Sequence, residues 1–342
     1  MRHQNLKWFM DSKITIIVPV YNAQAFLKES LNSIIRQTDK DWTCLLINDG
    51  STDGSQSIID EYCIADGRFI GLSKQNEGGC AKAKYFGVRH AKTEFIMIVD
   101  ADDILGDDNY LENLKRRQRE TNADIVLSRM CCFEGAPTNI VWTLPDEHVD
   151  CDQIIDGKTA CLLTLPDWHI GLNGKLERKE LYDSLSEGDW AYIDEVHGRE
   201  LLIKSHRVAF ANTIYYYRSN PSSISRKLSP YIFDWSINDA LLARFAQEHF
   251  PENKTLKNEL ANRHFTRLVS DIISYGRVKD EFSKEECNRI EKALKQSYRY
   301  INISEVMKRK PLKGMAVVLL RPFSRFQRLV VSLSSIKQRI VS

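Results

Sequence analysis

The stretch ITIIVPVYNAQAFLKESLNSII, residues 14–35, changes its hydrophobic period partway along. Residues 14–18 are β-branched without a break, which indicates a strand that is buried on both faces. From Phe26 to Ile35 the apolar residues recur every three or four positions, as they do on one face of a helix. A buried strand followed by an amphipathic helix is the repeating unit of α/β proteins.

The same alternation continues along the chain. Further strands are expected at 43–47, 69–72, 95–99, 124–128 and within 207–217, and further helices around 58–63, 82–91 and 108–121. Glycines and prolines break up 134–167, and the pattern after Pro230 is helical. The order predicts an α/β fold with a mixed, mostly parallel sheet, followed by a helical C-terminal region.

Composition limits the class of protein. The chain has 342 residues, 43% of them hydrophobic, which is enough for one large domain or two smaller ones. The eight cysteines form no CxxC pair and the histidines no zinc pattern, so we expect a reduced, cytoplasmic protein. The N-terminus does not resemble a signal peptide, and no apolar run approaches the ~18 residues of a spanning helix.

Charge is distributed unevenly. Residues 308–342 hold nine Lys or Arg and no Asp or Glu. Because the whole chain has a net charge of +2, the remaining residues have a net charge of about −7. Within this tail, apolar residues such as Val317 and Leu320 interleave with arginines, which is typical of an amphipathic segment at an anionic membrane surface. The alternative is a helix that packs on the body of the protein. Nucleic acid is not an expected partner, because the tail contains no recognised binding motif.

Carboxylates gather at the end of one buried strand, in FIMIVDADD at 95–103. Asp100 and Asp102 flank Ala101, and clustered carboxylates are a natural site for Mg2+ or Mn2+. The alternative is that Asp102 or Asp103 caps a helix that begins near Leu105. Asp103 is expected to be structural, and Asp107 with Asp108 to form the cap and first turn of the next helix.

Two other motifs also follow strands. In NDGSTD, at 48–53, Asp49 could accept a hydrogen bond from a nucleotide, although the same residue types also form simple turns. In KQNEGGCAKAK, at 74–84, Gly78 allows close approach of a ligand and Lys84 could reach a phosphate. Neither GxGxxG nor GK[ST] occurs there. Ligands bind beyond the carboxyl ends of parallel strands, so PVYN (19–22), NDGSTD and DADD should share one edge of the sheet.

Taken in order, these motifs resemble those of the family 2 glycosyltransferases of the GT-A fold, of the kind that builds bacterial surface polysaccharides. The resemblance covers residues 13–226 and includes the weaker segments NGKLERKELY, YIDE and YYYRSNPSSIS. It implies a GT-A domain at 1–228, with a nucleotide-sugar half at 13–128 and an acceptor half at 129–228. A helical region would follow at 229–307, and the basic tail at 308–342.

The resemblance also implies roles for individual residues. Asp49 would bind the base, Asp100 the ribose, and Asp102 of the DxD motif the divalent metal on the diphosphate. Asp194 would be the general base, with Asp189 as a second candidate, and Asn173 and Lys175 would lie under the acceptor site. The full set implied to bind the donor is Pro19, Val20, Tyr21, Asn22, Asp49, Gly78, Lys84, Asp100, Ala101, Asp102 and Arg218.

Two positions depart from the family pattern. Ile193 stands before Asp194, where the family often has Glu. Lys84 stands where the family usually has Arg, which keeps the charge but loses the bidentate fork of a guanidinium.

The implied activity is an inverting transfer from a nucleotide-diphosphate sugar, with a UDP-sugar as the expected donor. The implied acceptor is a hydroxyl of a glycan or lipid-linked glycan at the inner face of the cell membrane. Two alternatives stay open: a polyprenyl-phosphate monosaccharide transferase, and a nucleotide-sugar binding protein without catalysis.

Overall fold

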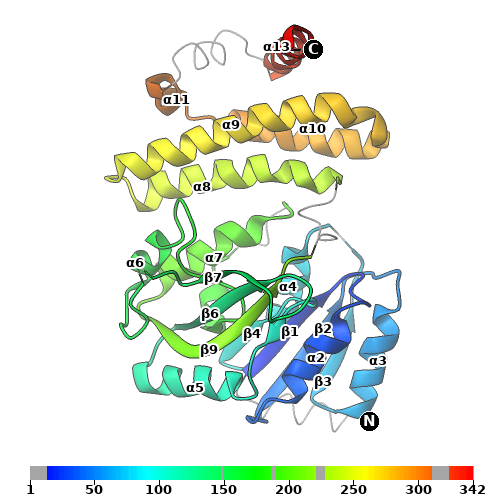
Figure 1. Ribbon diagram of the computed structural model, residues 1–342, viewed down its shortest axis with the longest axis vertical. Coiled ribbons are helices and arrows are strands. Elements are labelled where there is room, and N and C mark those ends of the chain that lie inside the picture. Colours follow the sequence, from blue (N-terminus) through cyan, green and yellow to red (C-terminus); the bar gives the residue numbers. More distant parts are fainter. Residues whose placement is uncertain are drawn as a thin grey trace. The chain divides into compact units, whose positions relative to one another are not determined.

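The computed structural model describes residues 14–76, 78–147, 149–185, 190–220, 228–309 and 323–341. The chain divides into two compact units (Figure 1). The first comprises Met1–Gly188 and His197–Pro221. The second comprises Asp189–Val196 and Ser222–Ser342, so a short segment from the middle of the sequence belongs with the C-terminal helices.

The first unit is an α/β structure, as the sequence predicts. Its strands are β1 (Ile14–Val20), β2 (Trp42–Asn48), β3 (Phe69–Ser73), β4 (Phe95–Ile98), β5 (Ile104–Leu105), β6 (Ile125–Phe133), β7 (Ile140–Leu144), β8 (Leu176–Arg178) and β9 (Val208–Arg218). Its helices are α2 (Leu27–Ile35), α3 (Ser55–Ala65), α4 (Cys80–His90), α5 (Tyr110–Thr121), α6 (Gly157–Leu162) and the 3-10 turn η1 (Lys179–Tyr182), and the chain then enters α7 (Ile193–Lys204).

Among the described residues the nine strands form one sheet in the order β3-β2-β1-β4-β8-β6-β9-β5, with β7 paired to β6. The half that contains β3, β2, β1 and β4 is parallel. Strand β8 joins it to the second half through antiparallel pairs with β4 and β6. The mixed, mostly parallel sheet of the sequence prediction is therefore confirmed.

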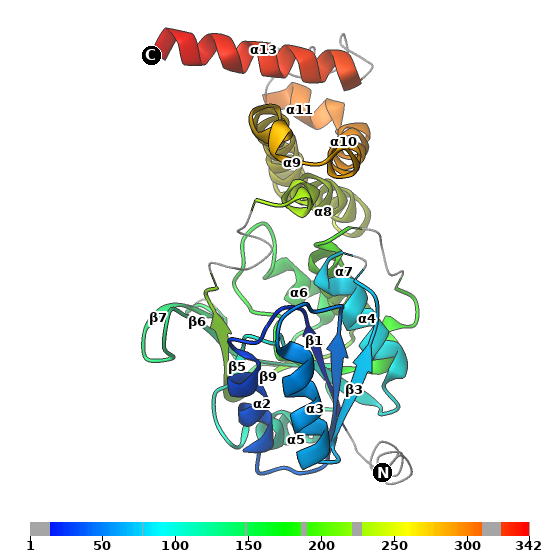
Figure 2. The ribbon, with the colours of Figure 1, turned by 90° about the vertical axis from the view of Figure 1, so that its right-hand side faces the viewer.

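Alternate residues of β1 serve two separate layers of the core. Ile14, Ile16 and Val18 pack with the apolar faces of α2 and α3. Ile17 faces the opposite side and packs with α4. Figure 2 shows β1 with α2, α3 and α4 around it. Gly87 allows α4 to lie unusually close to the sheet, because a Cβ at this position would lie 2.3 Å from Cγ2 of Ile17.

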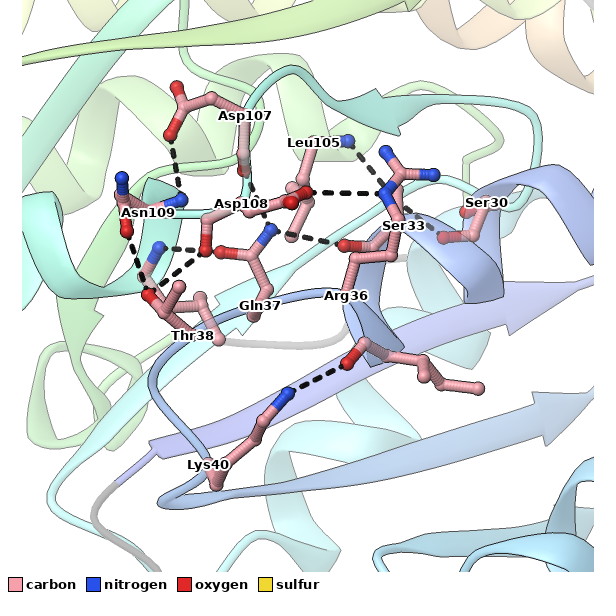
Figure 3. A network of polar contacts seen from close by, with 12 residues as sticks. Ser30, Ser33, Arg36, Gln37, Thr38, Lys40, Leu105, Asp107, Asp108 and Asn109 are labelled. Carbon is pink, nitrogen blue, oxygen red and sulfur yellow. Dashed lines mark hydrogen bonds and ion pairs between the residues drawn. The ribbon is translucent and has the colours of Figure 1, made fainter.

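The segment after DADD differs from the prediction. Helix α5 begins at Tyr110 after Asn109, so Asp107 and Asp108 are not its N-cap and first turn. The amide of Gln37, just after α2, instead holds this segment. Its Nε2 donates to the carbonyl of Asp107 (2.8 Å; Figure 3), and its Oε1 accepts from the backbone N–H of Leu111 (3.0 Å). The buried amide of Gln37 therefore satisfies the hydrogen-bonding groups of this backbone, in place of a helix cap by Asp107 or Asp108.

A second difference concerns the short strands. The sequence indicates no strand at β5, β7 or β8. Strands β5 and β8 have only two and three residues, which leave no period to detect, and β7 lies in the stretch that glycines and prolines break up. The alternative prediction that Asp102 or Asp103 caps a helix beginning near Leu105 is also wrong. Ile104 and Leu105 form strand β5, which pairs with β9.

The second unit is helical after residue 228. It contains η2 (Pro230–Asp234), α8 (Trp235–His249), α9 (Lys254–Val278), η3 (Lys279–Glu281), α10 (Lys284–Arg299), α11 (Ile303–Arg309) and α13 (Phe323–Val341). Aromatic and aliphatic residues of α9 and α10 form its core. His264 is buried there and bonds to Ser297 (3.0 Å), whose hydroxyl donates to the carbonyl of Ser236.

Part of the basic tail belongs to this core. Phe323 and Phe326 of α13 are buried, and the ring of Phe326 lies 5.1 Å from that of Tyr298. Arg325 and Arg328 on the same helix are exposed. Of the helices in the described ranges, none combines the length and the apolar character that crossing a membrane requires.

Candidate active site

The three sequence motifs meet at one edge of the sheet, as predicted. Strands β1, β2 and β4 are parallel neighbours, with Val20 paired to Asn48 and Ile17 paired to Ile98. PVYN, NDGSTD and DADD therefore follow three adjacent strands at their carboxyl ends. Pro19 and Val20 are buried within β1, whereas Tyr21 is 52% exposed just beyond it.

Polar contacts join the first two loops. Asn22 has a left-handed backbone (φ +49°), and its Oδ1 accepts from the backbone of Thr52 (2.8 Å). Its own N–H donates to the Ser51 hydroxyl (3.1 Å). Because Asn tolerates this conformation better than most residues, Asn22 is suited to tie the end of β1 to the loop after β2.

Asp49 already has a cationic partner. Its Oδ1 lies 2.8 Å from Nζ of Lys74, and both side chains are less than 10% exposed. Lys74 follows β3, so the ion pair links the ends of two neighbouring strands. A carboxylate has up to four acceptor positions, so the ion pair with Lys74 does not by itself prevent Asp49 from accepting from a base.

A third contact brings α4 to the acidic motif. Nζ of Lys84 lies 3.2 Å from Oδ1 of Asp100, and Nδ2 of Asn173 donates to Oδ2 of the same carboxylate (3.2 Å). Gly78 and Gly79 precede α4 with φ of +83° and +84°, a backbone conformation that favours glycine. Lys175 pairs with the fully buried Glu177 (3.1 Å), and its Nζ also donates to the carbonyl of Leu172 (3.2 Å).

Asp102 is half-buried beside the carboxylates of Asp100 and Asp103. Burial raises its pKa and the Asp100 charge adds to the increase, while a hydrogen bond from Asn220 to its Oδ2 (3.0 Å) opposes it. A divalent ion would relieve this repulsion between neighbouring carboxylates. Ala101, between the two acids, is buried.

Asp103 is structural, as expected. It is fully buried, its Oδ2 accepts from the Tyr215 hydroxyl (2.7 Å), and its Oδ1 accepts from the backbone of Arg218 (2.8 Å). Burial and the charges of Asp100 and Asp102 hold its pKa well above the ordinary value. The Tyr215 oxygen also accepts from the backbone N–H of Asp100 (3.2 Å), so β9 fixes both ends of DADD.

Arg218 lies beside the acids but is directed into the protein. Its Nε donates to the backbone carbonyl of Asp102 (2.8 Å), and its Nη2 pairs with Glu29 of α2 (2.5 Å). The guanidinium also lies over the rings of Phe26 and Phe133. In this arrangement Arg218 shapes the backbone of Asp102.

Asp194 belongs to the second unit. It is in the first turn of α7, in the segment that belongs with the second unit, and its side chain is half-buried. The other candidate base, Asp189, lies outside the described residues.

Sequence reasoning missed four residues of this site: Lys74, Glu29, Asn220 and Tyr215. Lys74 had a detectable signal, since a lysine directly after a parallel strand lies at the same edge as the other strand ends. The other three are distant in sequence: Glu29 lies in α2, Tyr215 lies in β9, and Asn220 follows β9 by two residues. Only the tertiary fold brings them to DADD.

A family model, described as glycosyl transferase family 2, matches residues 15–163. The chain is 29% identical over 225 residues to the glycosyltransferase GlyG of Streptococcus pneumoniae serotype 4, covering 64% of this chain and 74% of GlyG. It is 31% identical over 126 residues to the poly(ribitol-phosphate) beta-glucosyltransferase of Bacillus spizizenii, covering 36% of this chain and a fifth of that protein's length (20%).

The fold has a counterpart among solved structures. S. aureus TarS 1–349 in complex with UDP-GlcNAc superposes with a TM-score of 0.61 at 18% identity, covering 95% of this chain and 92% of that one. At this identity the likeness establishes the fold, which is GT-A. The family match over residues 15–163, the similarity to GlyG and the GT-A fold identify the chain as a glycosyltransferase that carries a family 2 domain.

Proposed function

We propose that this enzyme transfers a sugar from a UDP-sugar to a hydroxyl of a glycan or lipid-linked glycan during synthesis of a bacterial surface polymer. The observation that carries the proposal is the acidic edge, where Asp49 follows β2 and both Asp100 and Asp102 follow β4, the two parallel neighbours of β1. The names of two similar proteins support the chemical classes: one is a poly(ribitol-phosphate) glucosyltransferase, and the other was solved with UDP-GlcNAc.

In this proposal the donor lies along that edge. The Tyr21 ring and the carboxylate of Asp49 contact the base, Asp100 the ribose, and the positive charge of Lys84 the phosphates. Pro19, Val20 and Ala101 are buried and contribute backbone atoms. Asn22 and Gly78 shape the loops on either side, and Arg218 holds the backbone of Asp102 in place.

The residues present fit Mg2+ or Mn2+. In the described part of the chain, no three acidic, histidine or cysteine side chains gather in a metal-binding group. An ion would thus take Asp102 as its protein ligand and the remaining ligands from diphosphate and water, an arrangement Mg2+ often adopts. Bound there, the ion would neutralise charge on the departing diphosphate. The Asp103 carboxylate, which already bonds to Tyr215 and Arg218, is assigned no part in binding it.

We assign Asp194 as the general base. It would accept the proton of the acceptor hydroxyl while that oxygen bonds to the anomeric carbon and the bond from that carbon to the diphosphate oxygen breaks. Attack from the opposite face is a single displacement that inverts the anomeric centre, and no protein nucleophile is needed.

A thermal-shift screen tests the donor site. UDP-, GDP- and dTDP-sugars are added with Mn2+ or with chelator, since a ligand that binds only the folded protein stabilises it. A donor at 100 times its Kd should add about 2.7 kcal/mol. We expect the largest shift for a UDP-sugar with Mn2+, and the same shift in chelator would contradict the metal assignment.

The base is tested by Asp194→Asn, with Asp280→Asn, an exposed acid of the second unit, as the control. We expect Asp194→Asn to abolish transfer while the donor still stabilises the protein. Retained transfer would instead favour a lipid-phosphate acceptor, which needs no deprotonation. Bound donor with no turnover in any variant would favour a nucleotide-sugar binding protein.

We further propose that the enzyme is cytoplasmic and binds peripherally to the inner face of the membrane through α13. Because Phe323 and Phe326 belong to the core of the second unit, the matched test changes charge alone. Replacing exposed Arg325 and Arg328 by Gln should reduce binding to anionic vesicles, since each basic residue near such a surface contributes about 1 kcal/mol. Replacing exposed Lys295 and Arg299 on α10 is the control, and equal binding by both variants would count against the tail.

A further inference from the structure

The residues directly before Asp194 are held by the helices of the second unit. The backbone N–H of Ala191 donates to Oδ2 of Asp234 (2.9 Å). The ring of Tyr192 stacks on Trp235, with centroids 4.1 Å apart and planes 15° from parallel. Ala191, Tyr192 and Ile193 are all buried. The three residues that precede Asp194 are therefore all packed within the second unit.

The acceptor of the Ala191 bond is itself fixed. Asp234 ends η2, is fully buried, and receives a bidentate pair from Arg289 of α10, with Nη1 2.8 Å from Oδ1 and Nη2 2.7 Å from Oδ2. The Arg289 guanidinium also lies 4.2 Å from the centre of the Tyr231 ring. Two parallel charge-assisted bonds fix orientation as well as distance, so Oδ2 presents a well-defined acceptor to Ala191.

We infer that Arg289 and Asp234 act as a clamp that positions Asp194 for proton abstraction. The inference rests on the proposed role of Asp194 as the base. A general base must come within hydrogen-bond reach of the proton it accepts, and a misplacement of about 1 Å can cost on the order of 100-fold in rate. Ala191 lies three residues before Asp194, and α7 begins in between.

The clamp gives the second unit a part in the reaction. Its helices do more than support a tail, because they hold the backbone that leads into the first turn of α7. Arg289 and Asp234 are positioning residues, since they act through Ala191. A purely structural ion pair would affect thermal stability while leaving the turnover of the folded enzyme unchanged, and this difference can be measured.

Arg289→Lys is the principal variant, because it keeps the charge and loses the bidentate fork. Trp235→Leu removes the stacking partner of Tyr192 without a change in charge. Arg244→Lys is the control, since Arg244 also lies over a ring of this unit, that of Tyr300. We measure kcat and KM with acceptor and UDP-sugar below the melting temperature of every variant, and donor affinity by thermal shift.

We expect kcat to fall about 10- to 100-fold in Arg289→Lys and Trp235→Leu, with donor affinity within about threefold of wild type. Arg244→Lys should keep wild-type kcat. A wild-type kcat in both clamp variants, or an equal loss of kcat and donor affinity, would overturn the clamp. Asp194→Asn separates the two proposals: if it is active, the base assignment is wrong, and if it is inactive while Arg289→Lys is fully active, only the clamp is wrong.

Discussion

The ion pair between Lys74 and Asp49 permits a sharp test of how burial sets the strength of a charge contact. Lys28 and Glu61 form a pair of the same length, 2.8 Å, but their side chains are 54% and 58% exposed. The side chains of Lys74 and Asp49 are 9% and 5% exposed. Replacing each lysine by Met removes the same charge and keeps a similar chain length.

The two substitutions should have very different costs. Lys28→Met removes a solvent-exposed pair whose attraction water largely screens, so it should change stability little. Lys74→Met leaves a buried carboxylate without its cation, and breaking a buried pair in this way costs about 3–5 kcal/mol. At roughly 2–4 °C per kcal/mol for a unit of this size, the Lys74 variant should melt about 6–20 °C lower than wild type.

Thermal melts followed by circular dichroism compare the two variants, and a third variant checks the cause. If the cost comes from the unpaired charge, Asp49→Asn added to Lys74→Met should recover most of the lost stability. The reasoning is refuted if the Lys28 and Lys74 variants melt within about 2 °C of each other, or if Asp49→Asn in that background brings no recovery.

Three pH-dependent predictions follow from buried titratable groups. The raised pKa of Asp102 means that the folded protein loses stability as the pH rises above about 4. Asp102→Asn should therefore melt higher than wild type at pH 8, with the gap closing near pH 4, yet lose the Mn2+-dependent response to donor. Burial lowers the pKa of His264 to about 4, so the second unit should lose up to about 3 kcal/mol as the pH falls from 6.5 to 4, and His264→Gln should flatten that loss in urea titrations. Burial raises the pKa of Asp271 to about 8, so Asp271→Asn should be the more stable form at pH 8 and match wild type near pH 4, and an unchanged difference across that range would count against the assignment.

Much of the fold could be predicted because its central strands have long, uninterrupted patterns. Residues 14–18 and 43–47 lie within β1 and β2, which are buried along their whole length. The short strands β5 and β8 could not be predicted, since two or three residues form a strand only when longer neighbours supply the pairing. The cap of α5 was mispredicted because the amide of Gln37, distant in sequence, satisfies that loop.

The site was predictable to the same extent. The edge shared by Asp49, Asp100 and Asp102 follows from parallel strands alone. The partners of these acids do not, because Asn220, Tyr215 and Glu29 reach them through β9 and α2. The sequence identifies the charged groups at strand ends, whereas the tertiary fold decides which neighbour neutralises or orients each one.

The close contact between Gly87 and Ile17 has a consequence for how related chains can diverge. A methyl group at position 87 would meet Cγ2 of Ile17 at 2.3 Å, so α4 would have to move away from β1. Lys84 lies one turn earlier on the same rigid helix, and its reach to Asp100 would change with that movement. We therefore expect positions 17 and 87 to vary together among homologues, with a larger residue on α4 accompanied by a smaller one on β1. The packing of Ile17 against Gly87 in the core thus limits which substitutions are compatible with the ion pair between Lys84 and Asp100 at the sheet edge.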